Sequence, residues 1–244
     1  MPDWVSQSVK ESEEEKPGME RTKMTFDKVD TAAQFFHVLY YHRAIMFWQG
    51  VQIVKNHFDM ARYADIIMRL QPACIIETGA QNGGGTLYFM ELLEFYGLHR
   101  SPVVSIDPGG GWMQPVKEFG HPLVTIAADC LAAEAVAIAK KISEDARQGT
   151  GKKNILISLD SVHTKSHVAK ELAAYAPICA VAGDYLVVED TDHNGHPVMS
   201  EYGPSAWEAV QEFLANGAPF TPDTAIEKAY GPITNSPSGW LVRN

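Results

Sequence analysis

The segment Ile75-Ile-Glu-Thr-Gly-Ala-Gln-Asn-Gly-Gly-Gly85 decides the fold of this chain. Two β-branched apolar residues lead into the acid Glu77, and the first glycines that follow are Gly79 and Gly83. Apolar residues at helical spacing then fill Thr86–Tyr96. This order predicts a buried strand, a glycine turn and a helix.

The glycine turn has the features of a ligand site. Glycine lets backbone approach a ligand closely, and the free amides at a helix start face that ligand. The dinucleotide fingerprint requires G-x-G-x-x-G, whereas three residues separate Gly79 from Gly83 and Glu77 gives E-x-G-x-x-x-G. The same glycines would also suit a tight turn that only packs a helix on a sheet.

The rest of the chain alternates between strand-like and helix-like runs. The strand-like runs are Cys74–Glu77, Pro102–Asp107, Leu123–Ala127, Ile155–Asp160 and Tyr185–Glu189. The helix-like runs are Thr86–Tyr96, Ala132–Ser143, Thr164–Tyr175 and, after Pro204, Ser205–Leu214. This alternation predicts an α/β fold with a mostly parallel sheet covered on both faces. We expect Thr224–Tyr230 and Trp240–Arg243 to close the sheet as strands, antiparallel at an edge.

Three regions follow one another along the chain. Residues 1–25 are rich in Glu, Lys and Ser and predict a flexible acidic arm. Residues 26–70 form an N-terminal helical segment, and 71–244 form the α/β domain. The stretch Phe35 to Phe47 carries more large apolar groups than one helix face needs, so we expect a homo-oligomer with this stretch at an interface. The alternative is that it caps a ligand site within one subunit.

Composition narrows the class of protein. With 244 residues and a net charge of −10, the chain is large enough for a substantial core and too acidic to favour nucleic acid or an anionic membrane surface. It has neither an apolar run of membrane-spanning length nor an N-terminal signal core. Cys74, Cys130 and Cys179 lie far apart and predict reduced, buried thiols. We therefore expect a cytoplasmic protein that acts on a small molecule.

An acid stands at or just after the end of every predicted parallel strand. These acids are Glu77, Asp107, Asp129, Asp160, and the pair Glu189 and Asp190. Ligands of open α/β sheets bind beyond the carboxyl ends of the strands. One such acid alone could cap a helix, but crowded carboxylates repel and require ligand hydroxyls, amines or a cation. Asp107, one βα unit after the glycine turn, can accept hydrogen bonds from the ribose of a nucleotide, and Asp129 lies where an adenine edge would be.

The last three acids predict a metal site. Asp160, Glu189 and Asp190 end consecutive strands, and carboxylates without a cysteine suit Mg²⁺, Mn²⁺ or Ca²⁺ better than zinc. The alternative is that they are only solvated at loop mouths. His163 follows Asp160 by three residues, and histidine changes protonation near neutral pH, which suits a general base. His167 is expected to serve in packing or support.

Two further histidines lie on the loop after the last of these strands. His193 and His196, in Thr191-Asp-His-Asn-Gly-His-Pro197, could line the substrate mouth or be ordinary loop residues. Loops carry function more often than their share of a chain, but a lone histidine is usually structural. The loop interpretation is the one favoured here.

Several blocks of the chain, in order, resemble the cephalosporin hydroxylase/rhamnosyl O-methyltransferase family of S-adenosylmethionine (SAM)-dependent methyltransferases. The blocks include Trp48-Gln-Gly-Val, Lys55-Asn-His-Phe-Asp59, Pro72 through Gly84, Leu159-Asp-Ser-Val-His163, Gly183-Asp-Tyr-Leu-Val-Val-Glu-Asp-Thr191 and Pro237-Ser-Gly-Trp-Leu241. The resemblance runs from Trp48 to the C-terminus, and the block from Gly183 is its most specific part.

The resemblance implies a fold and a chemistry. The fold would be the class I methyltransferase fold, a Rossmann-like sheet with an antiparallel strand, and SAM would lie at the glycine turn with Glu77, Gly79, Gly83, Asp107 and Asp129. Mg²⁺ or Mn²⁺ would be held by Asp160, Glu189 and Asp190. The layout is also similar to catechol-type O-methyltransferases, where a lysine base occupies the position of His163. The expected function is metal-dependent methylation of a hydroxyl of a small natural product or sugar.

Two departures from the family pattern affect the cofactor side. The family often has Gly-Gly-Ser and Gly-Asp-Ser where this chain has Gly83-Gly-Gly85 and Ala128-Asp-Cys130. Two other functions stay open at this point. One is a hydroxylase or oxidoreductase, although the chain shows no obvious 2-His-1-carboxylate iron site. The other is a SAM-binding protein that transfers no methyl group.

Overall fold

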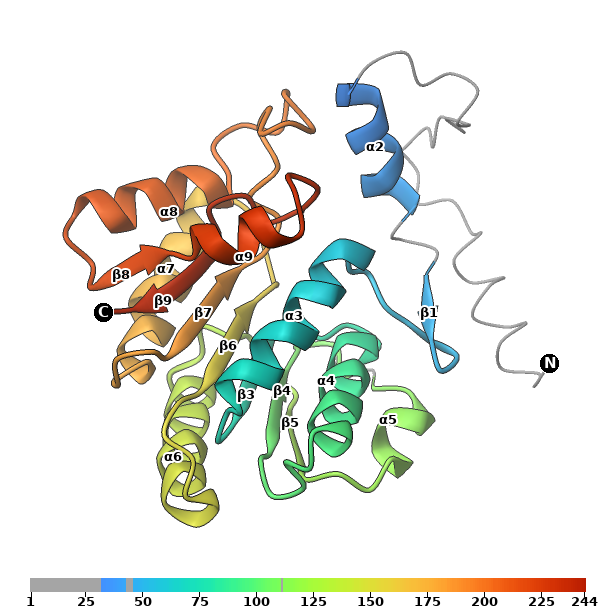
Figure 1. Cartoon of the computed structure of the whole chain (residues 1–244), viewed down its shortest axis with the longest axis vertical. Helices are drawn as coiled ribbons and strands as arrows, with labels where there is room; N and C mark the ends of the chain where they lie inside the picture. The colour runs from blue at the N-terminus through green and yellow to red at the C-terminus, as the bar shows by residue number, and fades with distance from the viewer. Residues whose placement is uncertain (1–31, 43–45, 111) are drawn as a thin grey trace.

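A seven-stranded sheet with strand order β5-β4-β3-β6-β7-β9-β8 forms the centre of the computed structural model, which describes residues 32–42, 46–110 and 112–244 (Figure 1). The predicted arm at 1–25 lies outside these residues. The strands are β3 (Ile75–Thr78), β4 (Val103–Ile106), β5 (Leu123–Ile126), β6 (Leu156–Leu159), β7 (Tyr185–Val188), β8 (Phe220–Pro222) and β9 (Trp240–Arg243). The first five match the predicted strands to within two residues.

The chain direction reverses at one strand only among those of this sheet. β3 to β7 pair in parallel, whereas β9 is antiparallel to both β7 and β8. The antiparallel strand therefore lies one place in from the edge, and β8 is the edge strand. The predicted strand at Thr224–Tyr230 is wrong: this segment is helix α9 (Thr224–Ala229), because the Asp223 side chain accepts hydrogen bonds from the amides of Ala225 and Ile226 and starts a helix there.

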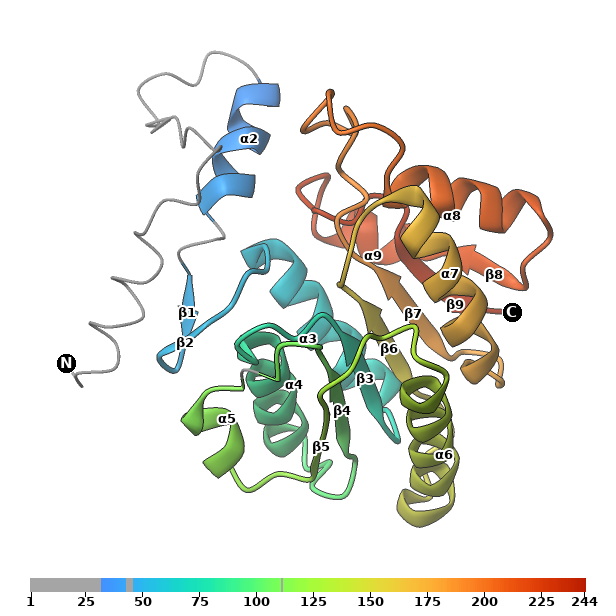
Figure 2. The ribbon, with the colours of Figure 1, turned by 180° about the vertical axis from the view of Figure 1, so that it is seen from behind.

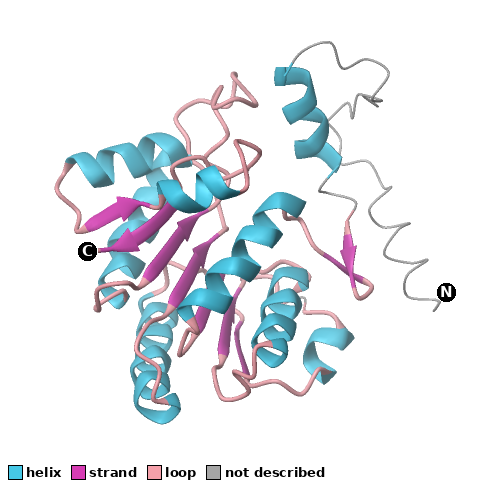
Figure 3. Cartoon of the chain, in the orientation of Figure 1, coloured by secondary structure: helices cyan, strands magenta, loops and turns pink. Residues whose placement is uncertain are grey.

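Helices cover both faces of the sheet, as the alternating pattern predicts (Figures 1, 2 and 3). On one face lie α3 (His57–Leu70), α4 (Gly84–Phe95), α5 (Gln114–Glu118) and α9. On the other lie α6 (Ala133–Thr150), α7 (Lys165–Tyr175) with the short helix η3 (Ala176–Ile178), and α8 (Ala206–Ala215). Among the described ranges, no helix combines the length and apolarity needed to cross a membrane.

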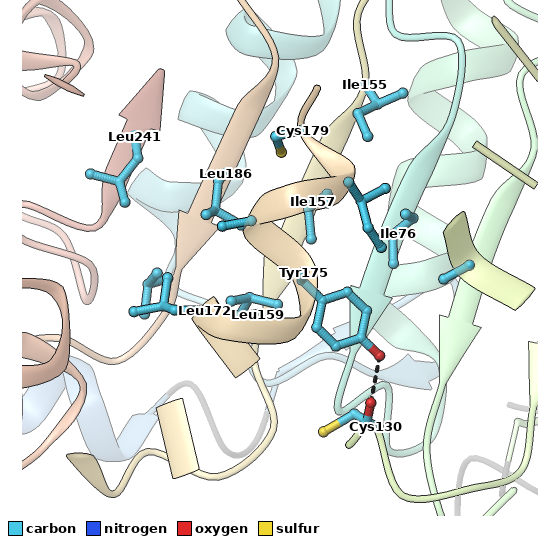
Figure 4. Close-up of a cluster of buried hydrophobic side chains, with 14 of the residues drawn as sticks. Ile76, Cys130, Ile155, Ile157, Leu159, Leu172, Tyr175, Cys179, Leu186 and Leu241 are labelled. Carbon is cyan, nitrogen blue, oxygen red and sulfur yellow. Dashed lines mark hydrogen bonds between the residues drawn. The ribbon is translucent and has the colours of Figure 1, made fainter. Parts of the chain in front are cut away.

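Each face of the sheet has its own buried core. Alternate strand residues point to opposite faces, so Ile76 and Ile157 pack beneath α6 and α7, whereas Ile75 and Leu156 pack beneath α3 and α4. Figure 4 shows the first core, in which the Tyr175 hydroxyl donates to the backbone carbonyl of Cys130 over 2.7 Å. This bond satisfies the polar end of a buried ring and ties α7 to the loop after β5. The three cysteines are buried and free.

The N-terminal segment adds a helix and a hairpin to the sheet domain. Helix α2 (Ala32–His42) contains the first part of the aromatic stretch, and Phe47 at the end of that stretch belongs to an antiparallel hairpin of β1 (Phe47–Trp48) and β2 (Val51–Gln52). Its turn carries Gln49 and Gly50 at positive φ. The hairpin leads into α3, and α2 lies on the side to which the arrowheads of β6 and β7 point (Figure 1).

Candidate active site

A cavity of about 510 Å³ opens at the carboxyl ends of the parallel strands. It is lined by most of the residues that the sequence singles out: Glu77, Gly79, Asp107, Asp129, Asp160, His163 and Asp190. Gly83 and Glu189 do not line it. The position of the cavity is the one expected for a ligand of an open parallel sheet.

The glycine turn serves protein packing as well as the cavity. Gly79 has φ +76°, and an ideal Cβ there would lie 1.9 Å from the backbone oxygen of Asp160. Gly83, with φ +87°, is the N-cap of α4, and a Cβ there would lie 2.9 Å from Trp112 Cδ1. The close approach that these glycines permit is therefore to the end of β6 and to Trp112. The first residues of α4, Gly84 and Gly85, still face the cavity.

The two acids of the predicted nucleotide side lie at the cavity wall. Asp107 is held by two backbone amides, with Oδ2 accepting from Gln81 over 2.9 Å and Oδ1 from Gly109 over 2.7 Å. Asp129 is exposed, and its Oδ1 accepts from the amide of Leu131 over 2.8 Å. Asp107 is therefore tied both to its own loop and to the glycine turn, whereas Asp129 is held only by its own loop.

A group of metal-ligating side chains gathers at the ends of β6 and β7. Asp160, His163 and Asp190 offer ligand atoms that all lie within 4.8 Å of one another. His163 Nε2 lies 3.3 Å from Asp190 Oδ2. Burial, together with the charge of Glu189, raises the pKa of Asp160 well above its usual range. The site therefore concentrates negative charge that a bound cation would offset.

Glu189 lies apart from this group. Its Oε1 accepts from Lys55 Nζ over 2.6 Å, from the Tyr63 hydroxyl over 2.7 Å and from the Ser158 hydroxyl over 2.6 Å. Its link to Asp160 runs through Lys55, whose Nζ also donates to Asp160 Oδ2 over 2.9 Å. The structure thus brings three of the predicted residues together directly and joins the fourth to them through a lysine.

Lys55 is the residue of this site that sequence reasoning misses. Its side chain is 3% exposed and its Nζ also lies 3.5 Å from Glu77 Oε1. Burial alone would lower the pKa of Lys55, but the charges of Asp160, Glu189 and Glu77 raise it well above its ordinary value. The one signal in the sequence is a lysine directly after the apolar pair Ile53-Val54, a place where burial requires a partner.

A second polar group forms the wall beside the nucleotide-side loop. His167 Nε2 lies 3.0 Å from the Ser161 hydroxyl, 3.6 Å from Cys130 Sγ and 3.7 Å from Glu171 Oε2. Burial raises the pKa of the Cys130 thiol to about 12, so the sulfur is protonated at neutral pH. Glu171 also accepts from the Thr78 hydroxyl over 2.8 Å. His167 therefore lines the cavity as part of a connected network.

The two loop histidines have different surroundings. His193 is buried, and its Nε2 lies 2.8 Å from the hydroxyl of Tyr40, a cavity-lining residue of α2. His196 instead stacks on Trp207, with ring centroids 4.1 Å apart. Helix α2 thus covers part of the cavity mouth within the same chain, while its Tyr41 is 46% exposed.

The sheet with its single reversed strand, the glycine turn before α4 and the cavity at the strand ends define the class I SAM-dependent methyltransferase fold. A model of the family described as Rhamnosyl O-methyltransferase/CmcI matches residues 40–244. The chain belongs to this family, which confirms the resemblance seen in the sequence blocks.

Curated relatives agree with the family assignment, and solved structures agree with the fold. The chain is 31% identical to the rhamnosyl O-methyltransferase of Mycobacterium leprae (strain TN) over 224 residues, which covers 90% of this chain and 94% of the relative. It is 31% identical to that of Mycobacterium tuberculosis (strain ATCC 25618/H37Rv) over 221 residues, covering 88% and 86%. A CmcI structure with Mg and SAM superposes with a TM-score of 0.59 at 17% identity, covering 82% of this chain and 77% of the other. An apo CmcI structure gives 0.61 at 19%, covering 82% and 76%.

Proposed function

We propose that this chain is a metal-dependent SAM O-methyltransferase that methylates a hydroxyl of a small natural product or sugar. The observation that carries the proposal is that one cavity contains both the glycine turn with Asp107 and the carboxylates Asp160 and Asp190. A methyl donor on the first set and a hydroxyl on the second would meet inside it. The names of the relatives point to the same chemistry, since they methylate a rhamnosyl group.

The cofactor side of the proposal assigns each residue a role. SAM would be held at the turn from Gly79 to Gly83, where the first residues of α4, Gly84 and Gly85, line the cavity. Asp107 accepts from the ribose hydroxyls, because its carboxylate is already oriented at the wall by two amides. Asp129 lies near the adenine edge. Glu77 connects the strand before the turn to the helix after it, because its Oε2 accepts a hydrogen bond from the Thr86 hydroxyl over 2.6 Å.

The metal side rests on the chemistry of the donor set. Asp160, Glu189 and Asp190 would hold Mg²⁺ or Mn²⁺, which fits because they supply only hard oxygen ligands. Burial, and after it the charge of Glu189, raises the pKa of Asp160, and a bound cation would favour the ionised carboxylate. When bound, the metal supplies Lewis acidity that lowers the pKa of a substrate hydroxyl and helps to orient it.

The protein residues carry the remaining steps. His163 takes the proton of the substrate hydroxyl, and Asp190 orients the imidazole from 3.3 Å. SAM would supply the methyl group to that hydroxyl oxygen, with S-adenosylhomocysteine as the leaving group. Holding both reactants on fixed groups provides much of the rate enhancement. Tyr40, whose hydroxyl lies 2.8 Å from His193 Nε2, lines the cavity from α2 and would border the substrate.

The Asp107→Ala variant tests the cofactor role. Loss of charge-assisted hydrogen bonds costs about 1.5–3 kcal/mol, so we expect SAM affinity measured by calorimetry to fall at least about tenfold. The matched control is Asp145→Ala, which removes an exposed carboxylate on α6 and should leave SAM affinity unchanged. If Asp107→Ala also leaves it unchanged, Asp107 does not contact the cofactor.

We also propose that the chain forms a homo-oligomer through the aromatic stretch from Phe35 to Phe47. The support is the exposed ring of Tyr41 on a helix that already projects from the sheet domain. Tyr40, by contrast, points to His193 of its own chain and is not available for a partner. Light scattering at micromolar protein should give at least the mass of a dimer, and Tyr41→Ser should shift it toward the monomer. A monomeric mass for the unaltered protein rules the proposal out.

A further inference from the structure

Lys55 is a buried cation at the junction of three strand ends. Its Nζ lies 2.6 Å from Glu189 Oε1 after β7, 2.9 Å from Asp160 Oδ2 after β6 and 3.5 Å from Glu77 Oε1 in β3. The lysine comes from the loop between β2 and α3, outside the sheet. A single positive charge therefore contacts carboxylates from both the proposed cofactor side and the proposed metal side.

The surroundings hold Lys55 in this place. Its Nζ lies 5.7 Å from the ring centroid of Tyr63 and 5.6 Å from that of Phe89, so both rings contribute cation–π attraction. An ideal Cβ at Gly85 would lie 2.7 Å from Lys55 Cε and 2.2 Å from Glu77 Oε1. A side chain at position 85 would therefore require Lys55 or Glu77 to shift from its present place.

The ammonium group and a divalent cation require the same atoms. A cation bound to Asp160 and Glu189 would contact the carboxylate oxygens that accept hydrogen bonds from Lys55 Nζ. Two cations that share buried carboxylate oxygens repel strongly, because the local dielectric constant is far below that of water. When a metal binds both carboxylates, either Lys55 moves away or the positive charge of Lys55 repels the metal and weakens its binding.

We propose that Lys55 competes with the divalent cation for Asp160 and Glu189, and so sets how tightly the site holds its metal. Lys55 is a positioning residue: it keeps the two carboxylates together and weakens metal binding. This proposal rests on the metal dependence proposed above. It predicts that removing the charge strengthens metal binding, whereas a purely structural lysine would predict that its loss weakens it.

The test is Mn²⁺ binding to Lys55→Met, followed by electron paramagnetic resonance without SAM or substrate. Methionine keeps a long apolar stem between the two rings but has no charge. We expect the Mn²⁺ dissociation constant to fall at least about tenfold, since removing one nearby buried charge is a large electrostatic change. Lys141→Met, an exposed lysine on α6, is the matched control and should leave the constant unchanged. Adding Glu189→Gln to Lys55→Met should remove most of the gain.

A second measurement uses the unaltered protein. The side-chain ¹⁵N signal of Lys55 can be assigned because it is missing from the spectra of Lys55→Met and Lys55→Arg. During a Mg²⁺ titration of the unaltered protein, this signal should shift with the same midpoint as Mg²⁺ binding. A stationary signal, or weaker Mn²⁺ binding by folded Lys55→Met, overturns the proposal. If the unaltered protein and Asp160→Asn bind Mn²⁺ equally, the metal site itself is wrong, and the proposed function fails with it.

Discussion

Asp160→Asn should abolish methyl transfer while leaving SAM affinity nearly unchanged. Asp160 lies next to His163 and Asp190, and it also forms an ion pair with Lys55, which in turn contacts Glu189. Its carboxylate is therefore near both of the other proposed metal ligands. Asparagine keeps the shape and can still accept from Lys55, but it removes a negative charge from a hard-cation site. SAM affinity should change little because Asp107, the proposed ribose acceptor, is held by the amides of Gln81 and Gly109 and has no hydrogen bond to Asp160.

Turnover, Mn²⁺ binding and SAM calorimetry together check this prediction. Mn²⁺ affinity should fall sharply in Asp160→Asn, and EDTA should abolish the activity of the unaltered protein until Mg²⁺ or Mn²⁺ is added back. Asp145→Asn, on the exposed side of α6, is the control and should behave like the unaltered protein. Full activity after chelation would show that the reaction needs no divalent metal.

His163→Ala should reduce turnover by about 10²–10⁴, the usual contribution of a general base. Alanine removes the imidazole that lies 3.3 Å from Asp190 Oδ2. Substrate and SAM would still bind, because the carboxylates and the glycine turn remain. The expected result is therefore a loss in kcat with little change in SAM affinity.

A measurement of Mn²⁺ binding to His163→Ala distinguishes two possible roles of His163, general base and metal ligand. Its ring nitrogen lies within 4.8 Å of ligand atoms of Asp160 and Asp190, so it could be a base or a ligand. As a base, His163→Ala retains Mn²⁺; as a ligand, it loses Mn²⁺ together with activity. His99→Ala, which removes an exposed histidine paired with Glu94, controls for the loss of an imidazole. Loss of the metal in His163→Ala would contradict the assignment made here.

Local pattern predicts the elements of this fold well and their ends less well. The strands β3, β4, β6 and β7 follow from short apolar runs, because a strand buried on both faces reads as continuous hydrophobic sequence. The edge strand β5 is less buried, yet its run Leu123–Ile126 is still mostly apolar. Thr224–Ala229 is the exception, since β-branched Thr224 and Ile226 suggest a strand whereas the Asp223 cap makes a helix. The other four residues, Ala225, Glu227, Lys228 and Ala229, are good helix formers, so the cap and the helix propensity of the segment act in the same direction.

The candidate site divides in the same way. The acids after the strands are predictable because a parallel sheet collects its strand ends at one edge. The contacts among them are not, since they depend on side-chain direction. Asp160 and Asp190 point into the cavity with His163, whereas Glu189, adjacent to Asp190 in the chain, points to Lys55 and Tyr63. Adjacent residues at the end of a strand point in opposite directions. Two acids that are adjacent in the sequence therefore do not necessarily bind the same ligand.

The sequence by itself determined the strand, glycine turn and helix at Ile75–Phe95, the alternating α/β order and the acids at the strand ends, because each depends on residues close together in the chain. The tertiary structure decided the place of β9 between β7 and β8, the contact of Tyr40 with His193 and the burial of Lys55 among Glu77, Asp160 and Glu189. The contacts of Lys55 with Asp160 and Glu189 and of Tyr40 with His193 join residues more than a hundred positions apart in the chain. Strand β9 reaches β7 only after helix α8, strand β8 and helix α9 have intervened in the sequence. The partners of Lys55 depend on where its loop lies relative to the strand ends, and no local sequence pattern predicts that position.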